Sequence, residues 1–414
     1  MFNIERWQEI FETIRKNKLR TFLTGLSVAS GIFILVILLG FGQGLSNGID
    51  KEFSNDASNT VWFWAQATSK EYKGLNPGRR IEFENENFDH LVKKHEDELE
   101  YKSSVVRIWQ GQVNYKNESG NYRVEGAYPD FQFIENTSQV QGRFFNFMDH
   151  QNIEKVAVIG NKVKDEIFKN EDPISKQLQI NGINFKVIGV YSDPGGEREE
   201  TRIFIPLSTS QRVFNGSNKV RLLTFSLKPQ KTFDESVEAS IKFAAEVDQY
   251  LKQAHIVAPD DTRAIGTNNT LEDVKRFHTL TNNIKLFFWF VGICTIIAGV
   301  VGVSNIMLII VKERTKEIGI RKAIGARPWS IIGMILHEAI FVTAFAGFAG
   351  LILSMGLLEI IGPNIEIDYI VNPTVNFRVA ITTVFILIIA GAIAGFFPAY
   401  KAAKIKPIVA LREE

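Results

Sequence analysis

Four long stretches of the chain contain no charged residue, and they limit its possible folds more than any other feature. They cover residues 21–49, 286–311, 339–358 and 379–400. A helix needs about 20 apolar residues to cross the hydrocarbon core of a bilayer, whereas a helix at the surface of a soluble domain keeps a polar face. We therefore expect four transmembrane helices, over residues 21–43, 286–311, 331–358 and 378–400.

The largest polar segment, residues 44–285, lies between the first two predicted spans. It contains 31 lysines and arginines and 35 aspartates and glutamates, for a net charge of −4. This mild acidity argues against a nucleic-acid-binding surface. About 240 residues are enough for two compact subdomains.

Local patterns within this segment predict a mixture of strands and helices. Alternating apolar and polar residues predict strands over residues 59–66, 104–117 and 120–129. Asn181 and Gly182 predict a tight hairpin turn. Helices are predicted over residues 86–100, 231–253 and 270–285, the last running directly into the second span. The expected fold class is thus a membrane α-helical protein with four transmembrane helices and a large α+β extracytoplasmic domain, of two subdomains, inserted between helices 1 and 2.

Lysines and arginines are distributed unevenly around the spans. Five precede the first span, six lie within residues 312–327 and four follow the last span, whereas the short loop 359–377 contains none. Cytoplasmic loops of membrane proteins are enriched in these residues. Both termini and residues 312–328 are therefore predicted to be cytoplasmic, and residues 44–285 to lie on the opposite side. The cytoplasmic parts include an amphipathic helix at residues 1–20 and a tail at residues 401–414.

Small residues recur at four-residue spacing inside the predicted spans, which allows helices to approach closely. Two explanations remain open at this stage. The rows form a seam within the bundle or between subunits, or they reflect the general tolerance of glycine in membrane helices. The candidate packing residues are Gly40, Gly44, Gly350, Gly391 and Gly395.

The segment between the second and third spans reads ERTKEIGIRKAIGARP and starts at Glu313. A helix is predicted from Glu313 to about Ile324, with an ion pair between Glu317 and Arg321 four residues apart. Gly325 is placed to end it, and the following proline prevents simple continuation. Isoleucines at positions 318, 320 and 324 give it an apolar edge, which a loop that only fixes topology does not need. We therefore interpret it as a docking helix for a cytoplasmic partner.

Glu338, at the cytoplasmic end of the third span, has two explanations. An ionisable residue at that depth is a functional candidate. Alternatively, it pairs with a lysine or arginine of the preceding cytoplasmic segment.

The sequence contains no recognisable catalytic or cofactor-binding motif. A P-loop of the form GxxxxGK[ST] is absent, and His337-Glu338 is not followed by the second histidine of a zinc-protease motif. The single cysteine, Cys294, lies in an apolar run and excludes an internal disulfide. We predict no enzymatic activity, metal or cofactor for this chain itself.

Several segments together resemble one family of membrane proteins. SNIMLIIVKERTKEIGIRKAIGARPWSIIGMILHEAI and the ending GFFPAYKAAKIKPIVALREE resemble FtsX-like permease domains of the MacB and LolC/LolE class of ABC transporters. LRTFLTGLSVASGIFILVILLGFGQGL resembles the first span of this class. KVAVIGNKVKDEIFKNEDPISKQLQINGINFKVIGVYSD resembles its MacB-type periplasmic core domain. Ser175 departs from the pattern, because the family often has glycine there.

The resemblance implies a permease subunit of an efflux or extraction system in a bacterial inner membrane. It implies a separate ATP-binding subunit that holds ATP and Mg, and a second permease copy or a homologous permease. ATP-driven closure of the ATP-binding subunits would be passed through the first and second spans to the periplasmic domain. The implied ATPase-coupling residues are Glu313, Arg314, Glu317, Ile318, Gly319, Arg321, Lys322, Ala323, Gly325 and Ala326.

Three other functions fit the same spans. They are release of lipoproteins to a carrier, regulation of a periplasmic cell-wall hydrolase in the manner of FtsX, and a receptor that has no ATPase. The hydrolase regulators usually have a shorter outer domain, and a receptor does not need the coupling segment, so efflux is the preferred interpretation. The substrate, the pairing of the permease and the use of an adaptor or outer-membrane channel stay open.

Overall fold

The computed structural model describes residues 18–53, 59–367 and 369–407, which divide into two compact units. The helical unit comprises the described residues up to Asp50 and from His278 onward, and the sheet unit is Lys51–Phe277. The amphipathic helix predicted at residues 1–20 lies almost entirely outside the described residues, as does the end of the predicted tail.

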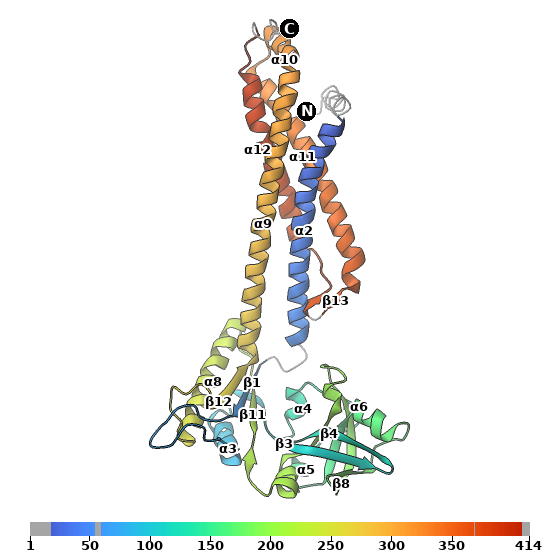
Figure 1. Ribbon diagram of the computed structural model, residues 1–414, viewed down its shortest axis with the longest axis vertical. Coiled ribbons are helices and arrows are strands. Elements are labelled where there is room, and N and C mark those ends of the chain that lie inside the picture. The colour runs from blue at the N-terminus through green and yellow to red at the C-terminus, as the bar shows by residue number, and fades with distance from the viewer. Residues whose placement is uncertain (1–17, 54–58, 368, 408–414) are drawn as a thin grey trace. The chain divides into compact units, whose positions relative to one another are not determined.

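Within the described residues, four long helices are each long and apolar enough to cross a membrane (Figure 1). Over their charge-free stretches the side chains are apolar around nearly the whole circumference, which suits a helix in lipid, where the backbone must satisfy its own hydrogen bonds. The predicted membrane-helical part of the fold class is thus confirmed. The helices are α2 (Lys18–Phe53), α9 (Thr270–Glu313), α11 (Pro328–Ile361) and α12 (Phe377–Ala403).

Two of these helices continue well beyond the predicted spans. α2 extends to Phe53, and α9 starts at Thr270 and runs unbroken to Glu313, as expected from the helical pattern before the second span. The sheet unit, Lys51–Phe277, is therefore shorter at both ends than the predicted domain 44–285.

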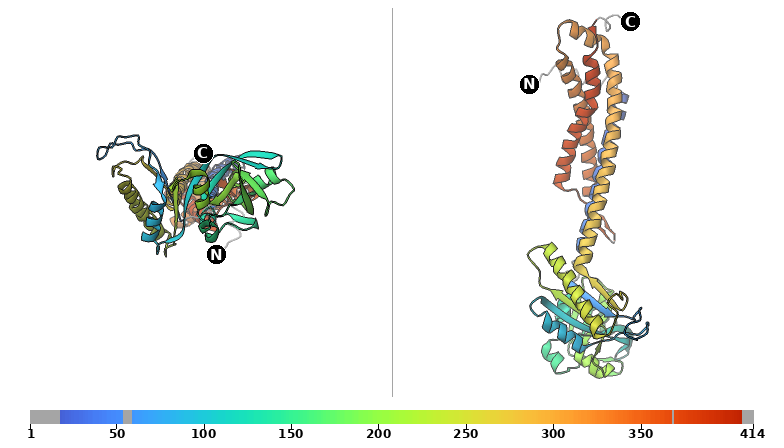
Figure 2. Two further views of the ribbon diagram at one scale, coloured as in Figure 1. Left: turned by 90° about the horizontal axis from the view of Figure 1, so that it is seen from below. Right: turned by 90° about the vertical axis from the view of Figure 1, so that its left-hand side faces the viewer.

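The connections of the helical unit are also structured. α10 (Thr315–Ala323) lies between α9 and α11. Between α11 and α12, where we predicted only a short loop, the chain forms the short helix η4 (Gly362–Asn364) and a small antiparallel pair of strands, β13 (Glu366–Ile367) and β14 (Ile370–Val371). α11 and α12 pack along their length, as both figures show (Figures 1 and 2).

The described part of the sheet unit is built on a mixed ten-stranded sheet, in the order β12-β1-β11-β3-β4-β9-β6-β8-β5, with β7 pairing to β3 and β8. Most pairs are antiparallel, but β4–β9 and β6–β8 are parallel. The strands are β1 (Thr60–Ala65), β3 (Leu99–Tyr115), β4 (Glu118–Ala127), β5 (Ser138–Gly142), β6 (Val156–Gly160), β7 (Gln177–Ile180), β8 (Ile183–Ser192), β9 (Arg202–Pro206), β11 (Leu222–Leu227) and β12 (Ile265–Asn269).

Shorter elements complete the sheet unit. β2 (Phe83–Glu84) and β10 (Lys219–Val220) pair with each other. The longer helices are α3 (Asn85–Lys94) and α8 (Phe233–Ala254), both amphipathic. The remaining helical turns are α4 (Phe131–Ile134), α5 (Phe147–Gln151), α6 (Asn161–Val163), η1 (Lys164–Phe168), η2 (Glu199–Thr201), α7 (Leu207–Ser210) and η3 (Gln211–Asn215).

The sheet passes through two lobes, which the long strand β3 joins. Its residues Leu99 and Val106 belong to a hydrophobic cluster with α3 and α8. Val113 and Tyr115, farther along β3, belong to a second cluster with β6 to β9. The α+β class is confirmed, but the two predicted subdomains share one continuous sheet.

Local sequence signals account for two turns and fail at one helix end. Asn181 and Gly182 have φ of 46° and 84°, as a type I′ hairpin between β7 and β8 requires. Ser175 has φ of 65°, a left-handed conformation that glycine adopts more easily. The helix predicted over residues 86–100 ends at Lys94, because Leu99 already begins β3.

Candidate functional site: the α10 segment and the cleft of the sheet unit

α10 is separated from the long helices on both sides by identifiable breaks. Arg314, with φ of −95° and ψ of 11°, interrupts the helix after α9. The predicted helix start at Glu313 is therefore wrong, because Glu313 still belongs to α9. At the other end Gly325 has φ of 102°, and Pro328 is the first residue of α11 rather than only a stop signal.

The inner side of α10 is attached to α11. Ile318 is 1% exposed and joins the hydrophobic cluster of the helical unit, and Gly319 beside it is buried. Arg314 donates from Nη1 to Oε2 of Glu338 in α11 at 3.2 Å, and the Glu338 side chain is 5% exposed. The structure thus contains the ion pair between Glu338 and the preceding segment, which was one of the two explanations for this residue.

A second attachment leads from α10 to α12. The ammonium group of Lys322 donates to the carbonyl oxygens of Ala403 and Ile405, both at 2.7 Å. These carbonyls lie at the C-terminal end of α12, where oxygens lack helical partners and the helix dipole favours a cation. No local pattern in the sequence indicates this contact, since the partners are backbone atoms some eighty positions away.

Two further charged residues of α10 form a pair on its own surface. Arg321 and Glu317 form the predicted ion pair, with Nη2 and Oε1 2.9 Å apart. Arg321 also contacts the sulfur of Met334 in α11. Exposed pairs of this type contribute only a few tenths of a kcal/mol, so the pair mainly orients the two side chains.

The outer side of α10 exposes apolar residues. Ile320 is 44% exposed, Ile324 is 83% exposed, and Trp329 at the start of α11 is 78% exposed. We call these three residues the α10 tip. The predicted isoleucine edge is therefore split, because Ile318 points inward and the other two outward. Trp329 was missed, although a tryptophan directly after the proline was a visible signal.

The other predicted coupling residues surround the tip or the helix end. Glu313 is exposed at the last position of α9. Ala323 and Gly325 are exposed, and Ala326 is half-buried. The segment thus combines side chains that hold it to two spans with an apolar surface that no other described residue covers.

The predicted packing glycines all lie where another element approaches closely. An added Cβ at Gly350 would collide with the backbone of Ala29 in α2, and one at Gly40 would collide with Leu358 in α11. One at Gly395 would collide with Ala339, and added Cβ atoms at Gly44 and Gly391 would lie 3.0 Å from Pro373 and Ile340, closer than ordinary contact. These contacts lie within the helical unit of one chain, which corresponds to a seam within the bundle.

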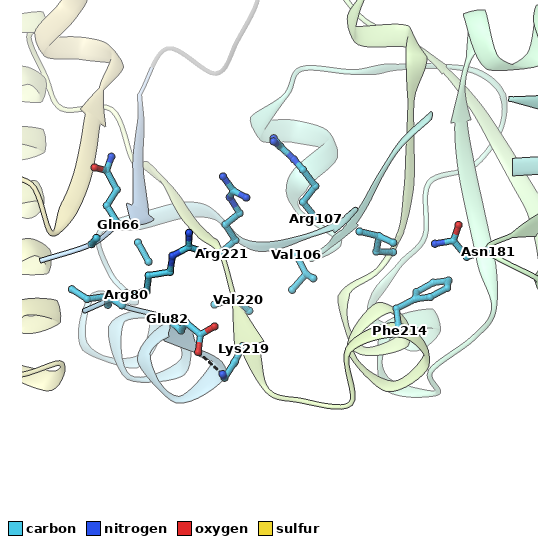
Figure 3. Close-up of a pocket in the computed structure, with 14 residues that line it drawn as sticks. Gln66, Arg80, Glu82, Val106, Arg107, Asn181, Phe214, Lys219, Val220 and Arg221 are labelled. Atoms are coloured by element: carbon cyan, nitrogen blue, oxygen red, sulfur yellow. Dashed lines mark hydrogen bonds and ion pairs between the residues drawn. The ribbon is translucent and has the colours of Figure 1, made fainter. Parts of the chain in front are cut away.

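The sheet unit contains a cleft of about 950 Å³. Its lining includes Arg80, Arg107 and Arg221 from separate segments, and Figure 3 shows Arg107 and Arg221 on one side of their strand segments and Val106 and Val220 on the other. Arg107 pairs through Nε with Oε1 of the buried Glu125 at 3.3 Å. No residue of this cleft was predicted as a site residue, because its walls come from parts of the chain that only the fold brings together.

Known families match both halves of the chain. Residues 21–242 match the MacB-like periplasmic core domain, and residues 289–407 match the FtsX-like permease C-terminal domain. The "Macrolide export ATP-binding/permease protein MacB" of Bdellovibrio bacteriovorus is 28% identical over 422 residues, covering 99% of this chain and 62% of that protein. The "Pyoverdine export ATP-binding/permease protein PvdT" of Pseudomonas syringae pv. syringae is 29% identical over 425 residues, covering 99% of this chain and 60% of that protein.

The chain therefore spans about three fifths of the length of these curated relatives. Among solved structures, the periplasmic region of MacB from Actinobacillus actinomycetemcomitans aligns with 56% of this chain and 97% of its own, at 19% identity and a TM-score of 0.44. The first family match alone covers more than half of the chain. The chain belongs to the MacB/FtsX family of ABC transporter permeases, as a multi-pass membrane protein with a MacB-like periplasmic core domain.

Proposed function

We propose that this chain is the permease of an ABC-type efflux or extraction system, and that an ATP-binding subunit docks on the α10 tip. The observation that carries the proposal is the exposure of Ile320, Ile324 and Trp329 on a segment that is otherwise firmly attached. A clustered apolar surface of this kind is typical of a protein interface. The matched relatives are named as ATP-binding/permease proteins for macrolide and pyoverdine export, which supports both the partner and the direction of transport.

The distribution of basic residues supports an orientation for this assembly. Lys312, Lys316 and Arg327 flank the α10 tip, in agreement with a cytoplasmic position. In this orientation both termini are cytoplasmic, the sheet unit is periplasmic and the helices cross the bacterial inner membrane. ATP and Mg²⁺ would be bound by the ATP-binding subunit, and this chain would bind neither.

The contacts of α10 suggest how a movement of the ATP-binding subunit reaches the membrane helices. A displacement of the tip acts on α11 through the Arg314–Glu338 pair, and on α12 through Lys322. The backbone leads directly into α9, which continues without a break to Thr270. We propose that α9, which packs against α2 around Gly31 and Gly292, passes the movement to the periplasmic domain.

A permease of this kind works as a pair, so a second copy or a homologous permease completes the proposed assembly. A periplasmic adaptor and an outer-membrane channel would extend the path in an export system. Release of lipoproteins, or control of a cell-wall hydrolase, would use the same docking site with a different periplasmic partner. The export names of the relatives favour efflux among these functions.

Copurification with the ATP-binding partner tests the docking proposal. We expect the double variant Ile320→Asp/Ile324→Asp to lose the partner and its stimulated ATP turnover, because two charges then replace the apolar surface. The matched control is Ile153→Asp, since Ile153 is an exposed isoleucine of the sheet unit at 41% exposure. Unchanged copurification and turnover in the double variant would refute docking at the tip.

A further inference from the structure

The last turns of α12 expose aromatic side chains that are followed directly by lysines. Phe396, Phe397 and Tyr400 are exposed, and so are Lys401 and Lys404. We call these five residues the aromatic–lysine face of α12. The charge-free stretch of this span ends at Tyr400, and residues 401–407 contain three lysines and no acidic residue. The face therefore lies where an apolar helix surface changes into a positively charged one.

Each lysine of this face lies over an aromatic ring one helical turn earlier. Nζ of Lys401 is 4.6 Å from the ring centroid of Phe397, and Nζ of Lys404 is 4.4 Å from that of Tyr400. Phe396 and Tyr400 also stack, with their centroids 6.4 Å apart. Because an ammonium group is attracted to the face of a ring, these contacts hold both charges back toward the apolar stretch.

The charges of these two lysines are not neutralised within the part of the chain that the structure describes. Neither Lys401 nor Lys404 forms an ion pair with a described residue. The neighbouring Lys322, in contrast, donates to two carbonyl oxygens, and Arg314 and Arg321 pair with glutamates. Both lysines of the face are therefore available to an anion from outside the protein.

The apolar part of the face suits lipid better than another helix. Helices that pack in a membrane usually meet through small residues, and the buried side of the same turns has Ala394, Gly395 and Ala399. The exposed side has large aromatic residues instead. At the end of a membrane span, such a surface borders the lipid, and the lysines beside it reach the level of the headgroups.

We propose that the aromatic–lysine face of α12 binds an anionic phospholipid. The phosphate accepts hydrogen bonds from the ammonium groups of Lys401 and Lys404, and the acyl chains lie along Phe396 and Phe397. An anionic headgroup is preferred to a zwitterionic one, because it has no cation of its own to repel the lysines. The lipid contact does not depend on the ATP-binding partner, and only its assignment to the cytoplasmic leaflet rests on the proposed orientation.

Native mass spectrometry of the full chain in detergent micelles measures the affinity for the first bound lipid. The probes are dioleoyl phosphatidylglycerol and dioleoyl phosphatidylcholine, which have the same acyl chains. We expect the phosphatidylglycerol to bind roughly tenfold more tightly. Soluble glycerol phosphate should not displace it, because it lacks the chains that contact the aromatic rings. Displacement would show a site for free phosphate and would contradict the proposal.

Variants locate the lipid on this face. A lysine near an anionic lipid contributes about fivefold to the affinity, so Lys401→Gln/Lys404→Gln should weaken phosphatidylglycerol binding roughly twentyfold. Binding of phosphatidylcholine should stay the same. Phe397→Leu/Tyr400→Leu keeps both lysines and an apolar surface, and it should weaken phosphatidylglycerol binding several-fold because the ring contacts are lost.

The matched control removes the same charge from the same end of the helical unit. Lys312→Gln/Lys316→Gln replaces two exposed lysines and should leave the preference for phosphatidylglycerol unchanged. The proposal is overturned by equal affinities for the two lipids, or by an equal loss in this control, because net charge alone would then explain the binding.

It is also overturned if Lys401→Gln/Lys404→Gln binds phosphatidylglycerol normally but no longer copurifies with the ATP-binding subunit, since the face would then belong to the docking site. Because the lipid measurement needs no ATP-binding partner, its failure would leave docking at the α10 tip intact. Conversely, a failure of docking at the tip would not change the lipid affinity.

Discussion

The helical unit and the sheet unit bury charged side chains in different places. In the helical unit the ion pair of the buried Glu338 with Arg314 lies at the α10 end, and the interior between the spans consists mostly of apolar side chains and glycines. In the sheet unit Arg202 lies in the core, 4% exposed. It bonds to Glu135 at 2.7 Å, to Asp193 at 2.9 Å and to Glu199 at 3.1 Å.

In the proposed coupling, this difference separates a firmly bonded part from a part that transmits movement. A charge cluster in the core of a sheet fixes the strands and turns around it, because each group would be costly to leave unpaired. Helices that meet through smooth apolar and glycine contacts have few directional bonds between them. The polar contacts of Arg314 and Lys322 therefore hold the α10 segment in position on α11 and α12.

The largest effect is expected at Arg202. Its replacement in Arg202→Gln leaves Asp193 and Glu135 buried without their cation, which we expect to lower the free energy of unfolding of the sheet unit by about 4 kcal/mol. Chemical denaturation of the full chain, followed by tryptophan fluorescence, measures the change. The exposed Arg198→Gln is the control, and a loss below about 1 kcal/mol at Arg202 would show that the cluster behaves as a surface network.

A somewhat smaller effect is expected at the corresponding pair of the helical unit. Arg314→Gln should lower its stability by about 3 kcal/mol, since Glu338 stays buried without its partner. Unfolding in mixed micelles with a denaturing detergent measures it. The double variant Arg314→Met/Glu338→Met should recover most of the loss. If the double variant is no more stable than the single one, the pair itself is not the cause.

The glycine contacts allow the apolar packing of the helical unit to be tested. Gly350→Val places side-chain atoms against the backbone of Ala29, so we expect a loss of about 2 kcal/mol in the same detergent assay. Gly356→Val is the matched control, because nothing lies within 4 Å of a Cβ added there. Equal stability of the two variants would argue against close packing of α2 on α11.

How much of the fold and of the candidate site could be predicted depends on how far apart along the chain the interacting residues lie. The spans, the Asn181–Gly182 turn and the Glu317–Arg321 pair follow from patterns within a few residues. The bond from Lys322 to the end of α12 and the walls of the cleft join distant segments. No local pattern encodes such contacts, because they exist only once the helices and the sheet have assembled.

The smallest effect concerns acid stability of the sheet unit. Burial by itself would raise the pKa of Asp261, but the hydrogen bonds that its carboxylate accepts outweigh this and lower the pKa to about 2. The donors are the hydroxyl of Ser69 and the amides of Ser69, Lys70 and Arg263.

Because this carboxyl is harder to protonate in the folded than in the unfolded chain, its contribution to stability is complete above about pH 4 and is lost as the pH falls toward 2. Asp261→Asn should therefore be less stable than the native chain at pH 7, and the difference should shrink between pH 4 and pH 2. Asp260→Asn, which changes an exposed neighbour, should show little of either effect. A difference that stays constant with pH would contradict this explanation.

Docking of the ATP-binding subunit on the α10 tip is tested most directly by the accessibility of single cysteines. In a Cys294→Ala background, Ile324→Cys and Trp329→Cys are labelled with a membrane-impermeant maleimide in inverted membrane vesicles, with and without the ATP-binding partner. We expect rapid labelling without the partner and strong protection with it, while Lys73→Cys in the sheet unit stays inaccessible from this side in both cases. Equal labelling of positions 324 and 329 with and without the partner, or protection by the membrane alone, would contradict the account.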